Sequence, residues 1–279
     1  MQSVISQLNW VQLRRLRWKK RSATVWLALS TTITFAQAAR CEAIHGWCLT
    51  QVHGISGSSH VYVSASGIKI VNDTTHLEIV SKAPSWQVVL YRPSQKIEFE
   101  LPLKEWTRRG MPGLDQWHQF IDDWSRTMAQ RNNYHGIPAV CILEKKDESS
   151  VVPQELGSTK GSYKVVGAEY WFSTSTPSPA GACAVLASYN ALPVPPLQQT
   201  KKFGLGLPLS FITRCSDGES SWSLKTTAMR QIEIDDSTIE YPRGYKQAKD
   251  IHEVSISAQK RAELDDFAKD LDIGKKFGK

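Results

Sequence analysis

The chain has 279 residues and a formal net charge of +7, with 34 Lys and Arg against 27 Asp and Glu. Six basic residues and no acidic residue lie in residues 1–38, so removing those six charges from +7 leaves +1 for the remainder. Binding to nucleic acid phosphates needs a concentrated positive surface. The charge distribution therefore excludes nucleic acid from the expected partners.

Residues 1–38 have the three-part pattern of an export signal. RRLRWKKR (14–21) is basic, ATVWLALSTTITF (23–35) is apolar, and Ala-Gln-Ala (36–38) supplies small residues for cleavage. The apolar stretch has 13 residues, whereas a membrane-spanning helix needs roughly 20. We expect a cleaved signal peptide over 1–38 and a protein in the periplasm or outside the cell. The alternative is an uncleaved membrane anchor.

Five cysteines follow this segment, in a compartment where disulfides form. Because the number is odd, at least one stays free or pairs with another chain. Cys41 and Cys48 are close in sequence, and we expect them to form a disulfide. Two alternatives stay open for the other three cysteines: a second disulfide, or burial as ordinary strand residues. These cysteines are Cys141, Cys183 and Cys215.

Residues 58–103 have the pattern of a β-meander. Short stretches rich in β-branched and aromatic residues are separated by turn formers. The stretches are HVYVSA (60–65), GIKIV (67–71), THLEIV (75–80), WQVVLY (86–91) and KIEFEL (96–101). Neighbours in sequence are expected to pair as antiparallel hairpins.

The last two of these strands carry the candidate binding residues. Their apolar positions alternate with the intervening residues, which places them on one face. They are Trp86, Val88, Leu90, Ile97, Phe99 and Leu101. This face either packs as a closed core or lines a cavity for an apolar ligand.

The periodicity changes after the meander. Apolar residues in 112–128 recur at steps of three or four, which predicts a helix that includes Trp117 and Trp124. Strands are then predicted over 139–146, 162–173, 182–192, 207–215, 221–234 and 237–242. A second amphipathic helix is expected over 259–271, before a basic tail.

These elements predict a mainly β, antiparallel fold with segregated helices (α+β). We expect one domain over 39–258, with a helical insertion near 112–130, followed by the C-terminal helix and tail of 259–279. The sequence has no GxSxG, P-loop, GxGxxG or HExxH motif. His53 and His60 lack a third ligand at metal spacing. We expect no catalytic activity, metal or cofactor; an unrecognised hydrolase is the enzyme alternative.

Two stretches resemble the LolA-like superfamily of periplasmic lipoprotein carriers. The first contains GIKIV, SKAPSWQVVLY and KIEFELPL, with a Pro-aromatic step and a Lys-apolar-Glu-apolar alternation. The second, IEIDDSTIEYPRGYKQA (232–248), resembles the closing segment of such proteins. The resemblance implies a strongly curved, open β half-barrel whose concave apolar face is capped by helices and receives acyl chains.

Two functional hypotheses follow. In the first, the protein binds a lipid or lipoprotein acyl chain in the half-barrel, with the six apolar positions as lining and Trp117 and Trp124 on a helical lid. In the second, the protein is a non-catalytic structural or accessory subunit. Its interior is then filled by its own side chains, and its surface binds another envelope protein.

Overall fold

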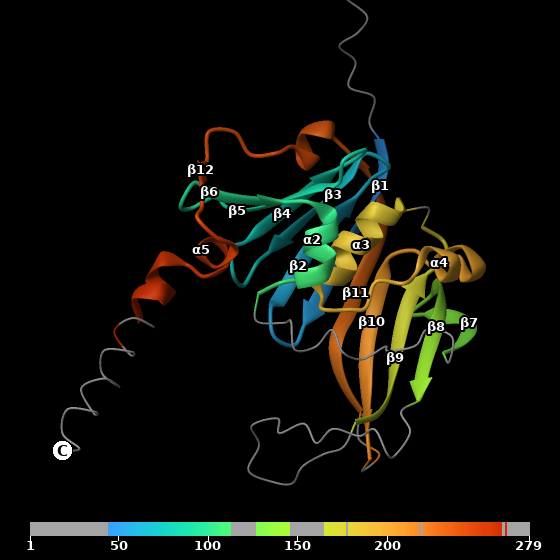
Figure 1. Ribbon diagram of the computed structural model, residues 1–279. Coiled ribbons are helices and arrows are strands. Elements are labelled where there is room, and N and C mark those ends of the chain that lie inside the picture. Colours follow the sequence, from blue (N-terminus) through green and yellow to red (C-terminus); the bar gives the residue numbers. More distant parts are fainter. Residues whose placement is uncertain are drawn as a thin grey trace, which may run out of the picture. The chain divides into compact units, whose positions relative to one another are not determined.

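The computed structural model describes residues 44–112, 127–145, 165–263 and 266, except positions 177, 217 and 219. These residues all belong to one compact unit, Ala43–Lys279. Their strands form one large, curved sheet of 12 strands that does not close on itself (Figure 1). The mainly β fold class predicted from the sequence is confirmed.

The first half of the sheet is a meander of six strands, each antiparallel to the next. The strands are β1 (Ile44–His53), β2 (Gly57–Val63), β3 (Gly67–Asn72), β4 (Glu78–Lys82), β5 (Gln87–Arg92) and β6 (Ile97–Leu101). The predicted meander over 58–103 is confirmed. β1 adds a strand before it that the sequence did not indicate.

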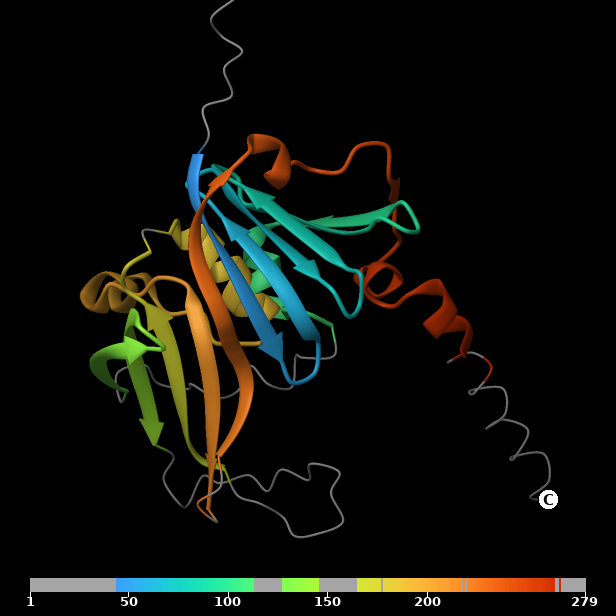
Figure 2. The same ribbon diagram turned by 180° about the vertical axis from the view of Figure 1, so that it is seen from behind.

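The second half is another antiparallel meander, and β11 pairs with β1 to join the two halves (Figure 2). Its strands are β7 (Met128–Tyr134), β8 (Ile137–Lys145), β9 (Val165–Ser173), β10 (Pro208–Cys215) and β11 (Ser220–Ile234). The two-residue β12 (Lys246–Gln247) runs parallel to β6 at the other end of the sheet. β7 and β12 are therefore the edges of the sheet.

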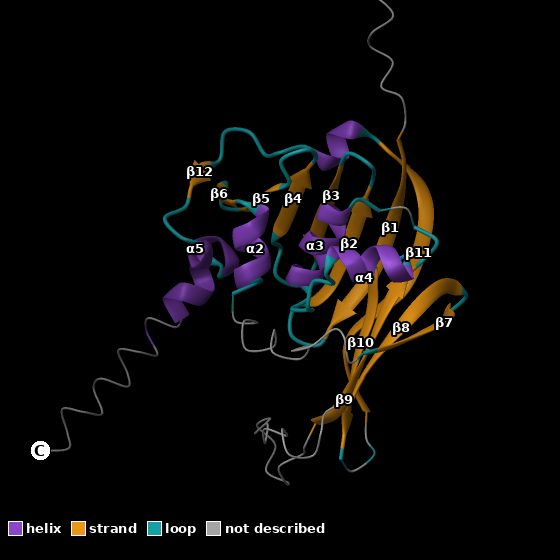
Figure 3. Ribbon diagram, turned by 45° about the vertical axis from the view of Figure 1, so that its right-hand side comes forward, coloured by secondary structure: helices purple, strands orange, loops and turns teal. Residues whose placement is uncertain are grey.

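Short helices connect and cover these strands (Figure 3). They are α2 (Leu103–Arg109), α3 (Ala180–Tyr189), α4 (Leu197–Phe203), the 3₁₀ helix η4 (Asp236–Ile239) and α5 (Ile251–Ser255). Buried residues of α2, α3 and α5 share one apolar cluster with β1 to β6. We call the sheet face that contacts α2 and α3 the inner face.

The segment after β11 passes around the β6 edge from the outer face to the inner face. Ile239 of η4 packs with Val80 and Val89 on the outer face, β12 pairs with β6, and Val254 of α5 joins the inner cluster. Arg92, 3% exposed, holds α5 in place: its Nε donates to Val254 O at 3.1 Å and one Nη to Ser255 O at 2.9 Å. This wrapping shields the β6 edge from pairing with other chains.

Two predicted strands are wrong. Residues 182–192 contain most of α3, because an alanine-rich apolar run has high helix propensity and few β-branched residues. Residues 237–242 begin in η4, which Asp235 initiates by accepting a hydrogen bond from Ser237 N at 2.9 Å. α2, α4, α5, β7 and β12 were not predicted.

The two predicted helices overlap the described residues only partly. Residues 113–126, with Trp117 and Trp124, lie outside them, and Met128 begins β7 rather than ending a helix. Residues 259–263 are helical, in agreement with the start of the predicted C-terminal helix. The predicted domain boundaries and the signal peptide over 1–38 stay predictions.

Candidate ligand-binding face

The inner face of the first meander carries two rows of apolar side chains that run across the strands. Directly paired residues on neighbouring strands point to the same side of a sheet. The first row is Trp47, Val63, Ile68, Ser81, Val88 and Leu101. The second row is Leu49, Val61, Ile70, Ile79, Leu90 and Phe99. Ser81 is the one polar residue in either row.

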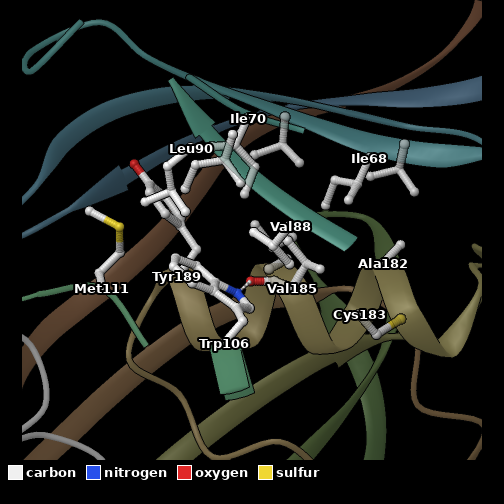
Figure 4. Packing of buried hydrophobic residues seen from close by; sticks show 14 of the residues in the cluster. Ile68, Ile70, Val88, Leu90, Trp106, Met111, Ala182, Cys183, Val185 and Tyr189 are labelled. Carbon is white, nitrogen blue, oxygen red and sulfur yellow. Dashed lines mark hydrogen bonds between the residues drawn. The ribbon is translucent and has the colours of Figure 1, made fainter. Parts of the chain in front are cut away.

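α3 lies against these rows (Figure 4). All eight residues from Ala182 to Tyr189 are buried, so the helix is enclosed on every side. Ala182 and Val185 share the apolar cluster with Ile68 and Val88. A helix that is apolar all round is typical of a buried position, and small side chains allow it to approach the sheet closely.

Trp106 and Trp86 fix α3 at two points. The indole Nε1 of Trp106, from α2, donates to Val185 O at 3.1 Å, and its side chain is fully buried. Trp86 lies on Gly181, where a Cβ atom would come within 2.2 Å of the indole ring. Trp86 itself has φ of +51°, a backbone conformation that is uncommon for an aromatic residue. Only glycine at position 181 permits this contact.

The predicted lining residues lie on the inner face but differ in exposure. Val88 and Leu90 are 0% exposed and Leu101 is 3% exposed. Trp86, Ile97 and Phe99 pack against the same cluster and are only partly buried. The structure thus brings six predicted residues onto one apolar surface, with the more exposed ones towards the β6 edge and the β4–β5 turn.

Beside the second apolar row, the inner face becomes polar. Thr226, Gln51, Ser59 and Asn72 are paired in that order across β11, β1, β2 and β3. Each is at most 2% exposed. We call these four residues the polar row. Each lies two positions along its strand from a buried apolar residue of the same face: Leu49, Val61, Ile70 or Leu224. Period-two alternation could therefore have located them in the sequence.

The C-terminal end of α3 docks on the polar row. The Tyr189 hydroxyl lies 2.8 Å from Ser59 Oγ and accepts from Asn72 Nδ2 at 2.7 Å. Asn190 Nδ2 donates to Gln51 Oε1 at 3.3 Å. Gln51 Nε2 in turn donates to Thr226 Oγ1 at 3.0 Å and to Pro208 O at 2.8 Å. α3 therefore meets the sheet with an apolar body and a polar end.

Some buried polar atoms at this interface have no hydrogen-bond partner among the described residues. They are Ser188 Oγ and Asn190 Oδ1 on and just after α3, and Ser81 Oγ in the first apolar row. Leaving a buried polar group unpaired costs about 1–3 kcal/mol. The polar contacts between the end of α3 and the inner face therefore leave some buried hydrogen-bonding atoms without partners.

His53 is a buried, neutral histidine next to this region. Its Nδ1 accepts from the backbone N–H of Ile55 at 3.2 Å and of Ser56 at 3.3 Å. Burial lowers the pKa of His53 to about 4, and a hydrogen bond with the backbone of Asn190 opposes this shift. His60 lies on the outer face, 3.3 Å from Asp73, so the two histidines do not meet.

The depressed pKa of His53 predicts a loss of stability in acid. The unfolded chain takes up this proton near pH 6.5 but the folded chain only near pH 4, so the contribution is complete above pH 6.5 and falls as the pH approaches 4. Between pH 7 and pH 5 we expect the wild type to lose about 2 kcal/mol more than His53→Gln. Urea denaturation at both pH values measures this, and equal losses would show that His53 titrates normally.

The cysteines do not form the predicted disulfide in this structure. Cys48 carries a free thiol on the outer face of β1, and Cys41 lies outside the described residues. No disulfide joins the cysteines in the described part of the chain. Burial raises the pKa of the Cys141 and Cys183 thiols to about 12, which keeps both thiols protonated and unreactive at neutral pH.

Within residues 44–112, 127–145 and 165–263, no group of three or more His, Cys, Asp or Glu side chains is placed to hold a metal ion. None of the described helices is long and apolar enough to cross a membrane.

Comparisons with known proteins give only loose similarities. No protein-family model and no curated protein matches the chain. An uncharacterized conserved protein from Thermus thermophilus is similar in structure, with a TM-score of 0.37, 10% identity and coverage of 78% of this chain and 98% of that one. A domain from Vibrio parahaemolyticus, described as an outer membrane lipoprotein-sorting protein, has a TM-score of 0.26, 10% identity and coverage of 75% and 94%. The resemblance to the LolA-like superfamily noted in the sequence stays a prediction.

Proposed function

We propose that this chain is an exported, non-catalytic protein that binds a lipid or another apolar ligand on the inner face of its sheet. The two apolar rows are the observation that supports this proposal most. Together they offer a continuous apolar surface across β1 to β6. Such a surface suits an acyl chain, because burial of apolar area drives binding without directional contacts.

The elements that cover this surface are short. α2 has seven residues and α3 has ten, and isolated helices shorter than about 12–15 residues are marginal in water. Their position on the sheet depends on packing rather than on their own stability. A ligand with a larger apolar surface can therefore compete with them for the inner face.

A second candidate function is that of an accessory subunit that binds another envelope protein. It is favoured by the complete burial of Val88, Leu90, Trp106 and Val185, each 0% exposed. These side chains fill the inner face without a guest. In that case the inner face is a permanent core and the partner binds elsewhere on the surface.

Titration with a fluorescent fatty-acid probe separates the two candidates. We expect saturable binding by the purified protein and displacement of the probe by unlabelled lipid. A probe that never binds, under conditions where the protein is folded, would favour the accessory subunit.

Export is a separate part of this proposal and rests on the N-terminal pattern. N-terminal sequencing of the mature protein should find a start at Ala39 or Arg40. An intact Met1 in the membrane fraction would show instead that residues 1–38 are an anchor.

A further inference from the structure

The polar row and α3 together indicate which kind of ligand the inner face accepts. We propose that the ligand is amphipathic, with an apolar chain and an uncharged hydroxyl or amide head, and that it displaces α3 so that its head occupies the position of the Tyr189 hydroxyl. This inference rests on the proposed function and adds the ligand class and the element that the ligand replaces.

α3 itself has the chemistry of such a ligand. Its ten residues, AGACAVLASY, contain no charged side chain and span about 15 Å at the helical rise per residue. The apolar body covers the apolar rows, and the hydroxyl at its end bonds Ser59 and Asn72. A chain with a hydroxyl at one end would match the same two surfaces.

Few side-chain hydrogen bonds hold α3 to the sheet, so a ligand that replaces it has mainly apolar packing to match. The side chains of α3 bond the sheet only through Tyr189 and the adjoining Asn190 among the described hydrogen bonds, and the Asn190 contact is long at 3.3 Å. Release into water would give partners to Ser188 Oγ and Asn190 Oδ1, which have none in the described part of the chain. Recovering this desolvation cost offsets part of the lost packing.

The environment of the polar row favours an uncharged head. Thr226, Gln51, Ser59 and Asn72 are all neutral and buried, and a charge placed there would lack a counter-ion. Arg92, on the same inner face, is a candidate cation. Its Nε and both Nη atoms already donate to the carbonyl oxygens of Val254, Thr75 and Ser255.

Three probes with the same chain length test the ligand class: 1-monolauroylglycerol, laurate at pH 8 and dodecane. Binding to the full-length protein is measured by displacement of the fluorescent acyl probe. We expect 1-monolauroylglycerol to displace it at a concentration at least tenfold below that of either other compound.

Three variants test the position of the head and the displacement of α3. Tyr189→Phe removes the hydroxyl that competes for the polar row, so monolauroylglycerol should bind several-fold more tightly. Ser59→Ala removes a partner of the head and should weaken its binding about tenfold relative to dodecane. Ser64→Ala is the matched control, because Ser64 is a buried hydroxyl, 4% exposed, that lies just after β2, outside both the apolar rows and the polar row, and bonds only Ser66 Oγ and the nearby turn among the described residues. It should change the binding of neither ligand. Thermal melting confirms that each variant is folded.

The outcomes distinguish this inference from the proposed function. Equal affinities for the three compounds would overturn the uncharged head and leave apolar binding in place. Unchanged or weaker binding by folded Tyr189→Phe would overturn the displacement of α3. Failure of all three compounds and of the probe would overturn the proposed function, and this inference with it.

Discussion

Replacing Trp106 with alanine should lower the free energy of unfolding by about 3–5 kcal/mol, the range measured for large aromatic side chains removed from cores. Trp106 is among the largest fully buried side chains of the protein. It joins α2 to α3 through the same apolar cluster and through the bond from its Nε1 to Val185 O. The variant therefore loses both packing and a buried hydrogen bond. Urea denaturation gives the change directly.

Trp106→Phe is the control for this variant. It keeps most of the apolar area and removes the indole N–H, so we expect a loss of about 1–3 kcal/mol from the carbonyl group of Val185 left without this donor. If Trp106→Ala cost less than about 1 kcal/mol, Trp106 would not be the contact that holds α2 and α3 together.

The second large effect is a contrast between two aspartate variants on the inner face. Val88→Asp should unfold the protein, because position 88 is 0% exposed and a buried, unpaired carboxylate costs several kcal/mol. Phe99→Asp should leave it folded, since Phe99 is only partly buried and lies at the β6 end of its row. A carboxylate there reaches water when no ligand is bound. Phe99→Asp should therefore no longer bind the fluorescent acyl probe.

Glu100→Ala is the matched control on β6. Glu100 is exposed on the outer face, so its removal should change stability by no more than about 0.5 kcal/mol and leave probe binding intact. Glu98 is a poorer control, because burial, and secondarily the neighbouring Glu100, raise the pKa of its carboxyl group. Thermal melting and probe displacement are measured on the same samples. Unfolding of Phe99→Asp would place position 99 in a closed core.

The sequence predicted the first meander well because local signals and burial agree there. β6 and most of β3 alternate apolar and other residues, and β5 is a short run rich in β-branched and aromatic residues. Turn formers separate these strands, and each strand pairs with its neighbours in the chain. The inner-face positions Val88, Leu90 and Phe99 follow directly from this alternation.

α3 was mistaken for a strand for a physical reason. A helix buried on all sides has no polar stripe, so its sequence lacks the 3.6-residue period that identifies surface helices. Its role also depends on distant partners. Ser59, Asn72 and Gln51 meet Tyr189 and Asn190 only after β1 to β3 have paired and α3 has docked. No local pattern contains that information.

Native mass spectrometry of the purified mature protein, before and after extraction with organic solvent, tests the central claim most directly. An apolar ligand on the inner face predicts an added mass before extraction, released as a lipid, and its return when the lipid is added back to the wild type but not to Phe99→Asp. A protein that carries no added mass and takes up no lipid, while Val88→Asp and Phe99→Asp both unfold, would show that the inner face is only a core.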